Sequence, residues 1–68
     1  MPLHEKTANL IWQIREELGI PGSEKMDWYF AELYLDYFGE DWVFYDAIYR
    51  WLMENIDDLE KDYFSKGV

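Results

Sequence analysis

The 68-residue sequence contains no cysteine, one histidine and only six basic residues. The lack of cysteine excludes disulfide bonds and thiolate metal sites. The single histidine, His4, has Ala8 where the second histidine of a zinc-protease helix would stand. We therefore expect neither a metal site nor a cofactor.

Long apolar runs are missing as well. The longest uncharged run, Thr7 to Ile14, falls far short of the ~20 residues that a membrane span needs. Glu5 and Lys6 stand where the apolar part of a secretory signal would begin. The chain also lacks a glycine-rich phosphate loop, because its glycines are explained by turns and by the chain end. These features predict a cytoplasmic protein.

Catalytic groups are not arranged as an enzyme requires. Neither Ser23 nor Ser65 has a histidine that could serve as its base. Paired carboxylates do acid–base chemistry only in a cleft that separates their pKa values, and so short a chain leaves little room for a cleft. We expect no catalytic residue and no enzymatic activity.

Aromatic residues, in contrast, are abundant: four Trp, six Tyr and four Phe. Each can bury roughly 150–250 Å² of surface. A small domain needs such side chains, because it hides only about 60% of the surface that its unfolded chain exposes. We expect residues 1–68 to form one acidic helical domain.

Apolar positions recur at helical spacing in three segments, which predicts an all-α fold, a small three-helix bundle. The first two helices are expected over about 3–18 and 24–38. The third is expected to begin after Asp41 and to continue to about residue 63. The predicted core consists of Leu10, Ile14, Leu18, Met26, Phe30, Leu33, Tyr37, Tyr45, Ile48, Leu52, Ile56 and Leu59.

The expected helix ends follow from glycine and from capping residues. Gly19 and Gly39 are typical of left-handed residues that end a helix. Ser23 and Asp41 are good N-caps for the second and third helices. An acidic variant of the capping box follows Asn55, so a short fourth helix after Asn55 is an alternative to one continuous third helix.

The formal net charge of the chain is −9, and the negative charge is concentrated in its second half. Residues 26–60 hold ten acidic residues against one base, Arg50, whereas the rest holds five of each. Arg50 lies four residues from Asp46 and from Glu54 and is expected to pair with both. Such a field repels nucleic acid and anionic membranes and attracts a basic protein surface. We therefore expect a basic, nucleic-acid-binding protein as partner, with no direct contact to nucleic acid or membrane.

Glu32, Asp36 and Glu40 follow one another at intervals of four residues, and no basic residue lies nearby to balance their negative charge. Each like-charge step opposes helix formation by about 0.2–0.5 kcal/mol. Carboxylates four residues apart on a helix are separated by ~6 Å of rise, which is of the order of the phosphate spacing along a nucleic-acid strand. An array of this kind could occupy a groove that binds DNA or RNA.

The pattern predicts a non-enzymatic inhibitor that mimics nucleic acid in the basic groove of a nucleic-acid-handling protein. In its general make-up, which is short, acidic, cysteine-poor and mostly helical, the chain is similar to phage anti-restriction and anti-CRISPR proteins, although no motif ties it to one such family. The predicted partner-binding residues are Glu32, Asp36, Glu40, Asp41, Asp46, Glu54, Asp57, Asp58, Trp28 and Trp42.

Two alternatives belong to other classes of protein. One is an antitoxin or immunity protein whose acidic residues cover the active site of a basic nuclease toxin. The other is a small helical homodimeric adaptor without mimicry, which would bind through a patch of apolar residues outside the main buried faces. The residues considered for that patch are Trp28, Leu35, Val43, Met53 and Phe64.

Overall fold

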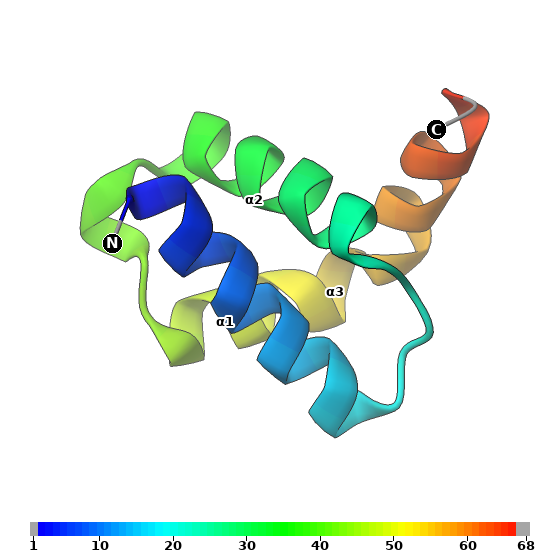
Figure 1. The fold of residues 1–68 in the computed structure, drawn as a ribbon, viewed down its shortest axis with the longest axis horizontal. Coiled ribbons are helices and arrows are strands. Elements are labelled where there is room, and N and C mark those ends of the chain that lie inside the picture. Colours follow the sequence, from blue (N-terminus) through cyan, green and yellow to red (C-terminus); the bar gives the residue numbers. More distant parts are fainter. Residues whose placement is uncertain (1, 67–68) are drawn as a thin grey trace.

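Three α-helices make up the chain, as predicted: α1 (Leu3–Leu18), α2 (Glu24–Phe38) and α3 (Tyr45–Ser65), with a short 3₁₀ turn, η1 (Glu40–Trp42), between α2 and α3. The structure is a computed structural model that describes residues 2–66. Within this range there is no β-strand, and no helix is long and apolar enough to cross a membrane. In Figure 1, α2 lies above α1 and the first half of α3, the end of α3 rises beside α2, and each helix contacts both others. The predicted all-α architecture is confirmed.

The ends of α1 and α2 form where the sequence predicts them. The backbone enters the left-handed region at Gly19, with a φ of 70°, and has a positive φ of 75° at Gly39. Only glycine adopts such angles at little cost. At the start of α2, the Ser23 hydroxyl accepts a hydrogen bond from the backbone N–H of Met26 at 3.2 Å. The predicted cap of α2 is therefore confirmed.

The start of α3 differs from the prediction. Asp41 does not cap this helix, because it lies within η1, and α3 begins at Tyr45 without a side-chain cap. The backbone N–H of Val43 donates to the carbonyl oxygen of Glu40 at 3.3 Å, which closes a 3₁₀ turn instead. Val43 is buried after this turn, so its burial offsets the loss of a cap.

The third helix is continuous, so the alternative of a fourth helix after Asn55 is wrong. The Asn55 side-chain amide donates to the carbonyl oxygen of Trp51 at 2.8 Å, one turn earlier in the same helix. Beyond this point, Leu59 and Tyr63 are buried on the face that packs against the rest of the molecule. A break near Asn55 would rotate both side chains away from that face.

The buried face of α2 is rotated relative to the predicted one. Its fully buried residues include Phe30, Ala31 and Tyr34, whereas Tyr37, predicted in the core, is 71% exposed. The reason is that Asp27 is buried too, at 2% exposure, and it extends the i, i+3, i+4, i+7 stripe on that side. Because aspartate is normally exposed to solvent, the sequence predicts a buried stripe that is shifted by one position.

A buried ion pair between Arg15 of α1 and Asp27 of α2 explains this rotation. The guanidinium donates through Nε to Asp27 Oδ1 at 2.9 Å and through Nη2 to Oδ2 at 3.1 Å. Its Nη1 donates to the carbonyl oxygen of Ile20 at 2.9 Å. The hydrogen bonds to Asp27 raise the pKa of Arg15, although burial opposes the rise. The pair fixes the register of α1 against α2 and ties both to the connection between them.

Gly22 is required by close packing over this ion pair. A Cβ atom at position 22 would lie 2.9 Å from Cδ of Arg15 and 2.3 Å from Cε of Met26. These separations are shorter than van der Waals contact, so any larger residue must displace the side chains beneath it. The connection between α1 and α2 thus forms a lid over the Arg15 stem.

Two tyrosines join α3 to the other helices through carboxylates. The Tyr45 hydroxyl donates to Glu17 of α1, and the Tyr29 hydroxyl of α2 donates to Asp62 of α3. The hydrogen bond to Glu17 raises the pKa of Tyr45 to about 12, and the bond to Asp62 raises the pKa of Tyr29. Both phenols bind their carboxylates only while they are protonated.

This arrangement predicts a loss of stability at alkaline pH. Because the pKa of Tyr45 in the folded state lies above its ordinary value of 10, its contribution is complete below pH 10 and is lost as the pH rises to about 12. Urea unfolding followed by circular dichroism between pH 9 and 12 is expected to show a steeper decline for the parent than for Tyr45→Phe. Tyr37→Phe is the control, since the exposed Tyr37 hydroxyl has no hydrogen bond within residues 2–66. Parallel declines for parent and Tyr45→Phe would contradict the prediction.

Candidate functional site

All eight carboxylates that the sequence predicts to bind a partner are exposed. On α2, Glu32 and Asp36 lie on the side opposite the stripe that contains Phe30 and Tyr34. The turn η1 carries two more, and α3 carries the remaining four; these six are Glu40, Asp41, Asp46, Glu54, Asp57 and Asp58. All eight are thus placed where a partner could reach them.

None of these eight carboxylates forms an ion pair within residues 2–66. The two ion pairs in this range join Arg15 to Asp27 and Lys66 to Asp62. The expected pairing of Arg50 with Asp46 and Glu54 is therefore not present. The negative charges on the outer faces of α2, η1 and α3 are left without a positive partner in the described part of the chain.

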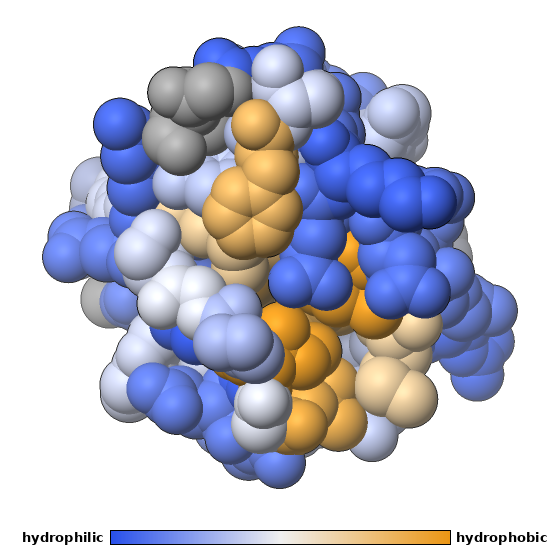
Figure 2. Space-filling view, turned by 90° about the vertical axis from the view of Figure 1, so that its right-hand side faces the viewer, coloured by the Kyte–Doolittle hydropathy of each residue, from blue (hydrophilic) through white to orange (hydrophobic). Residues whose placement is uncertain are grey.

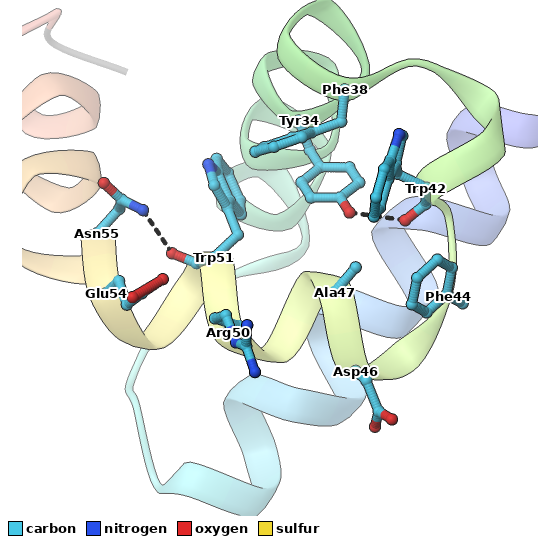
Figure 3. Close-up of a pocket in the computed structure, with 10 residues that line it drawn as sticks. All are labelled: Tyr34, Phe38, Trp42, Phe44, Asp46, Ala47, Arg50, Trp51, Glu54 and Asn55. Carbon is cyan, nitrogen blue, oxygen red and sulfur yellow. Dashed lines mark hydrogen bonds between the residues drawn. The ribbon is translucent and has the colours of Figure 1, made fainter.

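A cavity of about 390 Å³ lies where the end of α2, η1 and the first half of α3 meet. Figure 3 shows aromatic rings from all three elements around it. Two of the rings are buried and form its floor, Tyr34 at 0% and Trp51 at 7% exposure. The other three are exposed and form its walls: Phe38, Trp42 and Phe44.

Tyr34 fixes the geometry of this aromatic cavity. Its hydroxyl donates to the backbone carbonyl oxygen of Trp42 at 2.6 Å, which holds η1 against α2 (Figure 3). The Tyr34 ring lies 5.1 Å from the Trp51 ring, with planes inclined by 71°, and 4.7 Å from the Phe38 ring. Burial raises the pKa of Tyr34, so the phenol stays protonated and able to donate. The cavity is therefore preformed.

Charged side chains line the α3 side of the cavity. Asp46, Arg50 and Glu54 succeed one another at one-turn intervals along α3, and all three are exposed. In Figure 3 the Asp46 carboxylate points away from the aromatic rings, and Glu54 lies toward the Asn55 end of the cavity. Among the predicted partner-binding residues, the structure thus brings Trp42, Asp46 and Glu54 together at one site.

Trp28 lies elsewhere. Its ring packs on His4 of α1, with centroids 4.8 Å apart, and it is 38% exposed. Trp28 and Trp12 line a second hollow of about 530 Å³ between α1 and α2, over the Arg15–Asp27 pair. Both Trp28 and Trp42 are exposed, but the two rings belong to different sites.

The apolar patch considered for an adaptor is formed only in part. Val43 is buried and cannot contribute, whereas Met53 and Phe64 are 50% and 63% exposed. Figure 2 shows the face that carries the α1–α2 connection and the end of α3, where apolar side chains occupy a small area among hydrophilic ones. Large exposed apolar side chains are therefore distributed over several places, and the cavity gathers three of them, Phe38, Trp42 and Phe44.

Phe38, Phe44 and Trp51 are not among the site residues that the sequence predicts. The one signal for them is the high density of aromatic residues between positions 27 and 51, which core packing explains equally well. Within residues 2–66, no group of three or more His, Asp or Glu side chains is placed to hold a metal ion.

Comparisons with known proteins add no family assignment. No protein-family model, no curated protein and no solved structure significantly matches this chain.

Proposed function

We propose that this protein is a non-enzymatic inhibitor that binds the basic groove of a nucleic-acid-handling protein in place of nucleic acid. The observation that carries the proposal is the set of eight exposed carboxylates without an ion pair among the described residues. Unpaired surface carboxylates accelerate association with a basic surface and favour it over neutral or acidic ones.

The cavity supports binding to a protein. Energetically dominant contacts in protein interfaces are often aromatic residues in well-packed pockets, and the rim of an interface is polar. Here Trp42, Phe38 and Phe44 are exposed around one preformed cavity, and Asp46 and Glu54 stand beside it. The carboxylates, which steer association, and the aromatic rings, which anchor the partner, then belong to one binding surface.

The test is a pull-down with tagged protein from host lysate at low and high salt, with and without added duplex DNA, followed by mass spectrometry. The proposal expects a nucleic-acid-binding protein that DNA displaces and that high salt releases. A partner that DNA does not displace would contradict mimicry and favour an adaptor. Recovery of the protein alone would also contradict it and favour self-association.

Charge reversal tests the role of the acidic residues of α2 and η1. Replacing Glu32, Asp36 and Glu40 by lysine is expected to weaken binding to the captured partner by about tenfold or more, because three attractive charges become repulsive. The fold should survive, since all three side chains are exposed. Affinity is measured by calorimetry at moderate salt, and folding by circular dichroism.

A matched variant separates local from overall charge. Replacing Glu5, Glu16 and Glu24 by lysine changes the net charge by the same amount, at positions on α1 and at the start of α2. This control is expected to lose much less affinity than the variant with lysine at positions 32, 36 and 40. Equal losses would mean that only the net charge matters, and the assignment of the surface would then be wrong.

A further inference from the structure

The aromatic cavity between α2, η1 and α3 has a composition suited to one kind of side chain. Its floor is formed by the buried rings of Tyr34 and Trp51, and its walls by the exposed rings of Phe38, Trp42 and Phe44 (Figure 3). The faces of aromatic rings carry partial negative charge and attract cations within about 6 Å. At about 390 Å³ the cavity is within the range of sites that enclose a side chain or a small ligand.

The charges at the cavity agree with this preference. Asp46 and Glu54 supply two carboxylates against the single guanidinium of Arg50, so the rim is negative. Neither carboxylate forms an ion pair within residues 2–66. A cation entering the cavity can therefore contact aromatic faces and is attracted by the negative charge of the rim.

We propose that the cavity receives an arginine side chain of the basic partner. This inference rests on the proposed function, because it names the group that the partner inserts. A planar guanidinium stacks on aromatic rings and binds carboxylates with two parallel hydrogen bonds, whereas an ammonium group is more strongly hydrated and does neither as well. An apolar side chain would use the rings but leave Asp46 and Glu54 without a partner.

Arg50 competes for the same carboxylates. It lies one turn from each of them on α3, it is exposed, and it is unpaired in the described part of the chain. An incoming guanidinium meets its positive charge. Arg50→Gln is therefore expected to strengthen binding of an arginine-containing peptide by up to about fivefold, the size of an exposed charge interaction.

The direct test uses a synthetic peptide, acetyl-KGKGXGKGK-amide, in which X is arginine, citrulline, lysine or leucine. Citrulline keeps the shape of arginine without its charge. Binding is followed by NMR titration of the indole N–H signals of Trp42 and Trp51. The arginine peptide is expected to bind about two- to thirtyfold more tightly than the citrulline peptide, and to shift both signals.

Variants identify the cavity as the site of this preference. Trp42→Ala and Phe44→Ala are each expected to abolish the difference between the arginine and citrulline peptides. Both side chains are about half exposed, so the fold should persist. Trp12→Ala is the matched control, since Trp12 is 50% exposed on α1 and does not line this cavity. It is expected to leave the difference unchanged.

The outcomes distinguish this inference from the proposed function. Equal binding of the arginine and citrulline peptides, tighter binding of the leucine peptide, or no binding of any peptide would overturn the arginine assignment. The proposed function would still stand if DNA displaces the captured partner and charge reversal at Glu32, Asp36 and Glu40 weakens its binding. If DNA fails to displace the partner but the arginine preference holds and depends on Trp42, the cavity assignment stands and nucleic-acid mimicry falls.

Discussion

Replacing Arg15 by methionine is expected to lower the free energy of unfolding by about 3–5 kcal/mol, because Asp27 would remain buried as an unpaired charge. Both partners are nearly inaccessible, at 6% and 2% exposure. Methionine fills much of the space of the arginine stem, so the loss reports mainly on the missing guanidinium. Small domains are stable by only about 5–15 kcal/mol, and this variant is expected to be largely unfolded at modest urea concentrations.

Two further variants make the Arg15 experiment specific. Arg50→Met removes an exposed arginine without an ion pair among residues 2–66, and it is expected to change the free energy of unfolding by no more than about 0.5 kcal/mol. Arg15→Met combined with Asp27→Leu leaves no buried charge and should be more stable than Arg15→Met alone. Urea unfolding gives all three values. A loss below 1 kcal/mol for Arg15→Met would show that Asp27 finds water or another partner.

Replacing Phe30 by alanine is expected to cost about 3–5 kcal/mol as well, through the cavity that it leaves in the core. Phe30 is fully buried at the point where α2 meets α3. Its ring lies 6.2 Å from the Tyr63 ring with planes inclined by 75°, an edge-to-face contact between the two helices. The loss therefore includes the packing of the last turns of α3.

Phe64→Ala provides the comparison for Phe30→Ala. The two substitutions delete the same atoms, but Phe64 is 63% exposed and leaves little cavity. Its effect on the free energy of unfolding, measured by urea unfolding, is expected to stay within about 0.5 kcal/mol. Similar losses for Phe30 and Phe64 would mean that the end of α3 packs differently from the structure described above.

The ends of the first two helices could be predicted from the sequence because local chemistry determines them. Gly19 and Gly39 take positive φ angles, and Ser23 caps α2 with its own side chain. Such features need only a few neighbouring residues to form. The start of α3 could not be predicted in this way, because the burial of Val43 and the bond between Tyr34 and Trp42 decide where η1 ends.

The buried face of α2 was predicted only in part, and Asp27 is the reason. A carboxylate joins the core when a guanidinium meets it there, and Arg15 lies twelve residues away on another helix. Helical periodicity within α2 contains no information about that partner. The stripe was therefore placed one position away from the observed one, and Tyr37 was assigned to the core instead of the surface.

The candidate site, too, could be predicted from the sequence only in part. Exposure of the acidic residues followed from their number and spacing, because so many carboxylates cannot all be buried. The aromatic cavity requires three elements to converge, and core packing and surface display call for the same residue types. Nothing in the order of Phe38, Phe44 and Trp51 along the chain separates these roles.

The exposed carboxylates without internal partners also bear on how such a protein evolves. Substitutions at Glu32, Asp36 or Asp57 remove no ion pair among the described residues, so they are expected to cost the fold little. The core and the buried ion pair, in contrast, tolerate few substitutions. In the proposed function, recognition and folding are thus encoded by largely separate residues. Selection imposed by a changing target can then act on the surface while the helical framework is inherited intact.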